Sequence, residues 1–272
     1  MASGYKRSIS GRTFIMGILN VTPDSFSDGG MFLDKDKAVA RALEMRDEGA
    51  DIIDVGGEST RPGFIPVECE EEKRRIIPVI RQLSDMGMVI SVDTTKPEVA
   101  IAASENGASI INDIGGDLRS SGMAEAAAMN GSGLVIMFNC RRNGTQDGSI
   151  LNRAISETEE NIEYALAAGV DEDRIIIDPG IGFGTTRSQD IELTRGLKDL
   201  SFGDRFPVLY AASRKRVVKD IIGGTEDMDL LDDSSDALAL AAVSRGASLI
   251  RSHRIRNLRD QLNVFDRIME DK

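Results

Sequence analysis

The sequence contains no tryptophan, and only 4% of its 272 residues are aromatic. Hydrophobic residues make up 41%, so the core must be built mainly from isoleucine, valine, leucine, alanine and methionine. Such residues suit buried parallel strands better than an aromatic-rich sandwich of antiparallel sheets. The length is right for one α/β barrel, a fold that typically takes roughly 250 residues.

Cysteine and long apolar runs are also scarce. The two cysteines, Cys69 and Cys140, form no CxxC pair, which argues against a disulfide or a cysteine-bound metal. No apolar run approaches the roughly 18 residues that a membrane-spanning helix needs. The first 12 residues are polar and include no apolar signal region. We therefore expect a soluble, cytoplasmic protein that has no membrane partner.

Acidic residues outnumber basic ones, 45 to 33, so the formal net charge is −12. Proteins that bind the phosphate backbone of nucleic acids carry basic patches, so we expect no nucleic acid partner. A small anionic substrate remains compatible with this balance. A few arginine and lysine residues focused in one cleft can dominate the local potential whatever the global charge.

Eight short apolar segments alternate with helical patterns along the chain, and no Pro/Ser-rich linker divides them. The expected strands are 14–19, 51–56, 88–93, 109–112, 133–138, 174–178, 207–211 and 248–251. The expected helices are 34–49, 66–86, 97–106, 120–130, 152–168, 190–200, 216–222, 234–245 and 257–270. This alternation predicts a single-domain (β/α)8 TIM barrel over 13–272, preceded by a tail at 1–12. The main alternative is an open doubly wound sheet, which would more typically show a G-x-G-x-x-G turn after its first strand.

Polar residues stand at the carboxyl ends of most of these strands. They are Asn20, the loop 58–61, Asp93, Asn112, Asn139, Asp178, Lys215, Arg251 and His253. In a barrel these ends share one face, where enzymes of this fold place their active sites. We therefore expect the side chains to converge on one pocket. Each residue taken alone also has a simpler interpretation, as a helix cap, a turn residue or a structural histidine.

The chemistry of these residues divides them into three sets. Asp93, Asn112 and Asp178 suit a flat ring that is rich in N–H and carbonyl groups, because a buried carboxylate can accept two parallel N–H bonds. The cations and the histidine can donate to phosphate or carboxylate oxygens. They are Arg61, Lys215, Arg251 and His253. Asn20, with Asp24 or Asp28, offers hard oxygen ligands for Mg2+. The Pro/Gly-rich loops 21–30 and 57–65 are typical of lids that exclude water.

Six motifs together resemble those of the dihydropteroate synthases. They are MGILNVTPDSFSDGG at 16–30, DVGGESTRPG at 54–63, SVDTTKP at 91–97, INDI at 111–114, DPGIGFG at 178–184 and SRK at 213–215. The resemblance covers most of the chain. It implies an enzyme that condenses 6-hydroxymethyl-7,8-dihydropterin diphosphate with p-aminobenzoate and releases pyrophosphate. It also implies Mg2+ as a cofactor and a homodimer as the assembly.

The resemblance further implies a role for each matching residue. The pterin would be held by Asp93, Asn112, Asp178 and Lys215. The diphosphate would be bound by Asn20, Arg251 and His253, with Mg2+ at Asn20. The p-aminobenzoate site would be formed by Thr60, Arg61 and Pro62, with its carboxylate on Ser213. The residues expected to act in catalysis are Asp93, Asp178, Lys215 and Arg251. They would act through positioning and electrostatics, and no nucleophilic side chain is expected.

Three departures from the family pattern leave two other functions open. After the fifth strand the family usually reads His-Met-x-Gly, and this chain has Met137-Phe138-Asn139-Cys140. Thr185 stands where the family often has a lysine, and Arg254 stands where the family has an aspartate after the histidine. A paralogue could bind a pterin without turnover. A related barrel could instead transfer a methyl group from a reduced folate to a corrinoid partner, although that reaction has no need of Arg251 and His253.

Overall fold

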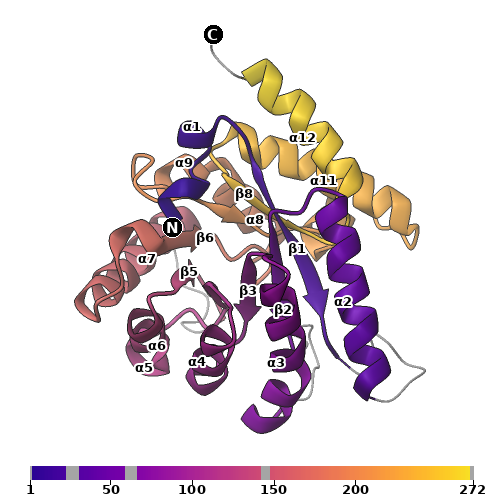
Figure 1. Ribbon diagram of the computed structural model, residues 1–272. Helices are drawn as coiled ribbons and strands as arrows, with labels where there is room; N and C mark the ends of the chain where they lie inside the picture. The colour runs from indigo at the N-terminus through magenta and orange to yellow at the C-terminus, as the bar shows by residue number, and fades with distance from the viewer. Residues whose placement is uncertain (1, 23–30, 59–65, 142–147, 270–272) are drawn as a thin grey trace.

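Eight parallel strands form the centre of the protein, and helices lie around them (Figure 1). The computed structural model describes residues 2–22, 31–58, 66–141 and 148–269. The strands are β1 (Phe14–Asn20), β2 (Ile52–Gly56), β3 (Ile90–Asp93), β4 (Ile110–Asp113), β5 (Gly133–Met137), β6 (Ile175–Asp178), β7 (Leu209–Tyr210) and β8 (Leu249–Ser252). Each described strand pairs in parallel with its neighbours in the order β6-β5-β4-β3-β2-β1-β8-β7. A parallel bridge between Ile177 and Val208 joins the two ends of this order, so the sheet closes and the predicted (β/α)8 barrel is confirmed.

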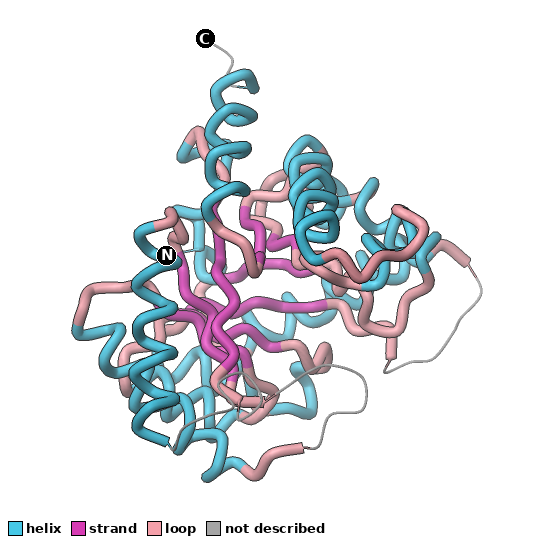
Figure 2. The backbone as a smooth tube through the Cα atoms, turned by 90° about the vertical axis from the view of Figure 1, so that its right-hand side faces the viewer, coloured by secondary structure: helices cyan, strands magenta, loops and turns pink. Residues whose placement is uncertain are grey.

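The helices separate consecutive strands and enclose the barrel, as the second view shows (Figure 2). They are α2 (Met31–Asp47), α3 (Cys69–Asp85), α4 (Pro97–Glu105), α5 (Leu118–Ser121), α6 (Met123–Asn130), α7 (Ile150–Ala167), α8 (Arg187–Arg195), α9 (Leu197–Leu200), α10 (Arg216–Ile221), α11 (Met228–Ser244) and α12 (Arg256–Met269). Across the described segments, none of the helices combines the length and the apolar character needed to cross a membrane.

Two expected helices are interrupted at glycine. The segment 120–130 was expected as one helix, but Gly122 takes a left-handed φ of 75° and separates α5 from α6. Gly196 separates α8 from α9, and a Cβ there would lie 2.3 Å from a methyl carbon of Leu151. The helix expected at 234–245 begins earlier, at Met228, because the Asp227 carboxylate accepts backbone N–H bonds as its N-cap.

The amino end of the barrel is covered by the first residues of the chain. Ala2–Tyr5 form a 3-10 turn and α1 (Arg7–Ser10) follows. The Tyr5 ring meets the Phe14 ring edge to face, with centroids 5.0 Å apart, and both pack against the interior apolar layer. The division into a tail at 1–12 and a barrel at 13–272 stays a prediction.

Side chains inside the barrel form an apolar layer at its amino end. This layer consists of Met16, Ile52, Ile110, Val135, Ile176, Leu209 and Leu249. The residues that alternate with them, such as Ile53 and Ile111, instead belong to the larger apolar cluster that includes side chains of the surrounding helices. Because successive side chains of a strand point to opposite faces, the position two residues after each layer member again points inward. On four of these seven strands, β2, β4, β6 and β8, that position holds a polar residue.

Candidate active site

A polar layer follows the apolar one toward the carboxyl ends of the strands. Its members stand two residues after an apolar-layer residue on the same strand, and they are Asp54, Asn112, Asp178 and Arg251. Asp93 of β3 is in register with Gly56 on one side and with Asn112 on the other. The strand geometry thus places four of the predicted site residues, Asp93, Asn112, Asp178 and Arg251, on the inner face of one end of the barrel.

Arg251 links this layer across the barrel. Its Nε donates to Asp54 Oδ2 at 2.6 Å, and its Nη2 donates to Asp93 Oδ2 at 2.6 Å. Asn112 Nδ2 donates to the same Asp54 oxygen at 3.0 Å. Among the described residues, Arg251 Nη1 has no hydrogen-bond partner, and the side chain keeps 16% of its surface exposed. One hydrogen-bonded network therefore joins strands β2, β3, β4 and β8. Within it, Arg251 Nη1 can still donate a hydrogen bond to a ligand.

Asp54 was not predicted as a site residue. It was assigned only to the strand 51–56 and to a family motif, yet it is fully buried and accepts two of the network's hydrogen bonds. Its Oδ1 is buried and lacks a hydrogen-bond partner within the described part of the chain. A signal for it exists in the sequence. A carboxylate between Ile53 and Val55 in a strand buried on both faces needs a cationic partner, because a buried unpaired charge is very costly.

Asp178 and Lys215 lie across the barrel from Asp54, at β6 and at the start of α10. We use the word pocket below for these two residues together with the network of Asp54, Asp93, Asn112 and Arg251. Asp178 Oδ1 accepts the Gly180 N–H at 2.7 Å, and Lys215 Nζ donates to the Ile181 carbonyl at 2.7 Å. The Lys215 ammonium also lies 4.6 Å from the centroid of the Phe183 ring. Gly180 has φ of 71°, and a Cβ there would lie 1.7 Å from the Phe138 carbonyl oxygen, so the turn requires glycine.

Burial shifts Asp93, Asp178 and Lys215 toward their neutral forms. Desolvation raises the pKa of Asp93 to about 7 against the opposing charge of Arg251. Burial also raises the pKa of Asp178, against the charge of Lys215. Desolvation lowers the pKa of Lys215 to about 8. For Arg251 burial opposes the charge, but Asp54 and Asp93 outweigh it and raise the guanidinium pKa. The site therefore holds a carboxyl and an amine whose protonation changes close to neutral pH.

Ser213 and His253 meet at the ends of β7 and β8. Ser213 Oγ lies 3.0 Å from His253 Nδ1, and the His253 backbone N–H donates to the same oxygen at 3.4 Å. The two residues were predicted separately, one for a carboxylate and one for diphosphate. The structure brings them together beside the strand that holds Arg251.

Asn20 ends β1 in register with Gly56. Its side chain is half-buried and makes no hydrogen bond within the described residues. In the described segments, no group of three or more His, Cys, Asp or Glu side chains could hold a metal ion. Asn20 is thus a single hard oxygen donor, which suits Mg2+ only if substrate oxygens complete the coordination. The other predicted ligands and the second loop lie outside the described residues: Asp24, Asp28, Thr60, Arg61 and Pro62.

Two of the three departures from the family pattern have structural roles beside the pocket. Thr185 is buried, and its hydroxyl donates to the buried Asp190 carboxylate, which also accepts the Gly182 N–H at 2.9 Å. Asn139 Nδ2 donates to the Ile114 carbonyl at 3.0 Å and so links the loops after β4 and β5. Neither residue belongs to the network of Asp54, Asp93, Asn112 and Arg251, so that network is intact in this chain.

Comparison with known proteins identifies the family of this chain. A profile of the family described as "Pterin binding enzyme" matches residues 16–253. The dihydropteroate synthase of Bacillus subtilis (strain 168) is 40% identical over 259 residues, which is 95% of this chain and 89% of that protein. A dihydropteroate synthase of Clostridium difficile, crystallised in the presence of pteroic acid, aligns with a TM-score of 0.89 at 39% identity over 96% of this chain and 98% of that one. The Xanthomonas albilineans enzyme with 4-aminobenzoic acid aligns with a TM-score of 0.89 at 40% identity, over 96% and 94% of the two chains. The chain therefore belongs to the dihydropteroate synthases, within the family of pterin-binding enzymes.

Proposed function

We propose that this protein condenses 6-hydroxymethyl-7,8-dihydropterin diphosphate with p-aminobenzoate to form 7,8-dihydropteroate and pyrophosphate. One observation carries the proposal. The buried network of Asp54, Asp93, Asn112 and Arg251 lies on the inner face of the barrel beside Asp178 and Lys215. Such a set suits a flat heterocycle with adjacent donors and acceptors. Structures of related enzymes were determined in the presence of pteroic acid and with 4-aminobenzoic acid.

The pterin is held by carboxylates and an amide in this proposal. Its amino-pyrimidine edge donates to Asp93 and Asp178, because carboxylate oxygens accept parallel N–H bonds. Its carbonyl and ring nitrogens accept from Asn112 and from Lys215, whose ammonium can form bonds beyond the one to Ile181. Burial of these groups excludes water and strengthens each contact.

The diphosphate end faces Arg251, His253 and Asn20. Arg251 Nη1 and the His253 ring donate to its oxygens, and the Arg251 charge offsets the charge of the leaving group. Mg2+ held through Asn20 and the diphosphate oxygens would supply further neutralisation, and this cofactor is part of the proposal. The C–O bond to the pterin methylene breaks, and diphosphate leaves with the electron pair.

Positive charge then develops on the pterin methylene and spreads into the ring. In this proposal the carboxylates of Asp93 and Asp178 stabilise that charge. The p-aminobenzoate nitrogen attacks the methylene carbon and loses a proton. Thr60, Arg61, Pro62 and Ser213 are the residues proposed to orient this second substrate. Catalysis rests on positioning and electrostatics, and no covalent enzyme intermediate is needed. We further propose that the protein acts as a homodimer in the cytoplasm.

The test is a pyrophosphate-release assay on the purified protein with Mg2+ and pterin diphosphate, with and without p-aminobenzoate. Pyrophosphate and dihydropteroate should form together and only with both substrates. Asp93→Ala and Arg251→Ala should each lose most of this activity. If the wild-type protein formed neither product, the proposal would be wrong. A separate assay of methyl transfer to cobalamin would then test the methyltransferase alternative.

A further inference from the structure

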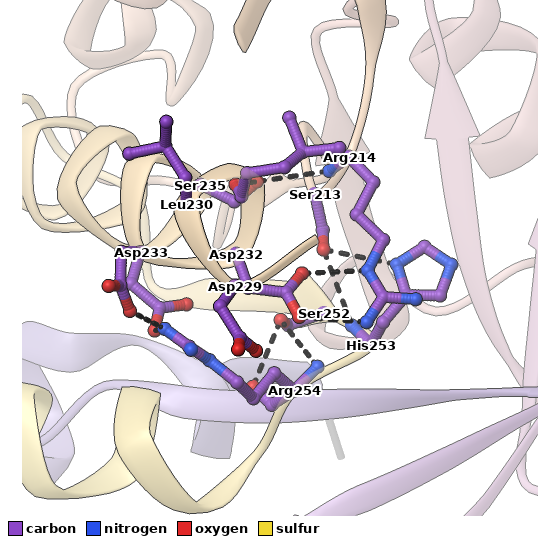
Figure 3. Close-up of polar contacts among 12 residues, drawn as sticks. Ser213, Arg214, Asp229, Leu230, Asp232, Asp233, Ser235, Ser252, His253 and Arg254 are labelled. Atoms are coloured by element: carbon purple, nitrogen blue, oxygen red, sulfur yellow. Dashed lines mark hydrogen bonds and ion pairs between the residues drawn. The ribbon is translucent and has the colours of Figure 1, made fainter. Parts of the chain in front are cut away.

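Helix α11 presents carboxylates to the loops that end β7 and β8 (Figure 3). We call Asp232, Asp233 and Asp236 the α11 acidic face. The side chains of Asp232 and Asp236 are 7% and 2% exposed, whereas that of Asp233 is 65% exposed. Arg214 and Arg254 extend from the two loops to meet them. The face is outside the pocket, and none of the roles proposed above uses it.

Arg214 has an unusual backbone conformation that this face stabilises. Its φ is 60°, in the left-handed region that is unfavourable for a residue with a Cβ. Its backbone N–H donates to Ser235 Oγ at 3.1 Å. Its guanidinium binds Asp232 through Nε at 2.7 Å and Nη2 at 2.8 Å, a bidentate pair of fixed geometry. A strained residue persists only where its surroundings determine it strongly, and here α11 holds both its backbone and its side chain.

Arg214 stands between two residues of the proposed site. Ser213 precedes it and directs its hydroxyl to His253 Nδ1 at 3.0 Å, while Lys215 follows it and reaches the pocket. Because the chain turns at Arg214, the φ of that residue decides where both neighbours point. The pair with Asp232 therefore bears on the placement of the Ser213 hydroxyl.

Arg254 shows a second, simpler use of the same face. Its Nη2 binds Asp233 and, at 2.7 Å, Asp236. Its backbone N–H and carbonyl both bond the Ser252 hydroxyl, at 3.3 Å and 3.1 Å. The cation that stands in place of the family's aspartate is thus paired with α11 carboxylates and turned away from His253 (Figure 3). Asp233 contributes only to this pair, and Asp236 remains when Asp233 is removed.

We propose that Asp232 is a positioning residue for the p-aminobenzoate end of the site. By holding Arg214 in the left-handed conformation, it keeps the Ser213 hydroxyl against His253 and available to the substrate carboxylate. This inference rests on the proposed function, since it needs the reaction as its readout. A purely structural ion pair between Asp232 and Arg214 would stabilise the protein and leave the substrate constants unchanged.

The experiment compares Asp232→Asn with Asp233→Asn, its neighbour on the same helix. For Asp232→Asn we expect the KM for p-aminobenzoate to rise roughly tenfold, as small misplacements of binding groups do. Binding of pterin diphosphate alone should be measured by calorimetry. Its Kd should stay within about twofold of the wild-type value, because no hydrogen bond joins Asp93 or Asn112 to α11 among the described residues. A change in Kd of about twofold is small compared with a tenfold change in KM. Asp233→Asn should leave both values unchanged. Asp232→Glu, which keeps the charge, should recover part of the loss.

A double-mutant cycle with Arg214→Gly separates geometry from charge. Glycine adopts φ of 60° without strain, so Asp232→Asn should cost little more in an Arg214→Gly background. If Asp232→Asn raised the KM equally in both backgrounds, a field effect of its charge would replace the proposed positioning role. An unchanged KM in Asp232→Asn, with an active wild type, would also overturn the inference. An inactive wild type would instead contradict the proposed function itself.

Discussion

Asp54 accepts the Nε–H of Arg251 at 2.6 Å, although 197 positions separate the two residues in sequence. The carboxylate is fully buried, so its charge depends on this guanidinium and on the Asn112 amide. Arg251 in turn depends on Asp54 first and on Asp93 second, because burial alone would lower its pKa. A residue from the first quarter of the chain and one from the last quarter therefore form a buried ion pair inside the barrel. Asp54 sets the orientation in which Arg251 can offer its remaining N–H groups.

Asp54→Asn is the first test of this arrangement. The amide keeps the shape of the side chain, but among the described residues it leaves Arg251 hydrogen-bonded to one carboxylate, that of Asp93. We expect the calorimetric affinity for pterin diphosphate to fall about tenfold and the free energy of unfolding to fall by roughly 1–3 kcal/mol, as for the loss of a hydrogen bond to a charged group.

Asp51→Asn is the matched control for that variant. Asp51 precedes β2, binds Arg259 and accepts the Ile15 N–H at 2.8 Å near the amino end of the barrel. It should lower stability without changing pterin affinity. Wild-type affinity in Asp54→Asn would contradict the role given to Asp54.

The pH dependence of kcat/KM follows from two shifted groups. Asp93, with its pKa raised to about 7 by burial, binds the pterin edge best when ionised, so kcat/KM should rise as the pH increases through about 7. Lys215, with its pKa lowered to about 8 by burial, donates as an ammonium, so kcat/KM should fall as the pH increases through about 8. The free enzyme should therefore show a narrow maximum between the two values.

The pH profile of kcat/KM measured for Asp93→Asn tests whether Asp93 is the group that controls the acidic limb. Removing the titrating carboxyl should flatten the limb while the alkaline limb remains. Burial also raises the pKa of Asp178, so this carboxyl contributes to what remains of the acidic limb. An acidic limb of unchanged midpoint and depth in Asp93→Asn would show that another group controls it.

The site could be predicted from sequence wherever a polar residue ends a strand. Asp93, Asn112, Asp178 and Arg251 were expected at one face because parallel strands in a barrel align their carboxyl ends, and the structure places them there. Asp54 lies inside its strand, two residues before the end, so a rule based on strand ends passes over it. Its partner could not be read from sequence either, since only the closed barrel brings β8 beside β1 and within reach of β2.

The α11 acidic face was beyond sequence reasoning for a related reason. Asp232 and Asp236 resemble the solvated charges of an ordinary helix, and their burial depends on the loops packed over them. Helix breaks were missed where the cause is tertiary. At Gly196, for example, the space beyond the Cα is filled by Leu151, a residue 45 positions earlier. The repeating alternation of strands and helices needed no such information, which is why the barrel itself was predictable.

A buried ion pair supports the base of the second loop. Lys96 Nζ donates to Glu58 Oε2 at 2.7 Å and to the fully buried Glu72 Oε2 at 2.5 Å. Lys96→Met would leave the Glu72 charge buried and unpaired, so we expect the free energy of unfolding to fall by about 3 kcal/mol in denaturant titrations. The double variant Lys96→Met with Glu72→Gln should recover part of this loss. If the single variant unfolded at the wild-type denaturant concentration, the pair would contribute nothing to stability.

Asn20→Ala tests the diphosphate end of the site separately from the pterin end. Asn20 is on β1, in register with Gly56, and makes no hydrogen bond to the Arg251 network among the described residues. If its amide oxygen helps hold Mg2+ on the diphosphate, its removal should raise the Mg2+ concentration for half-maximal activity by roughly tenfold, the loss typical of one group that supports a metal. Binding of 6-hydroxymethylpterin, which has no diphosphate, should be unchanged, because Asp93 and Asn112 remain. An unchanged Mg2+ requirement would remove Asn20 from the metal site, whereas weaker binding of the bare pterin would show that Asn20 acts on the pocket as a whole.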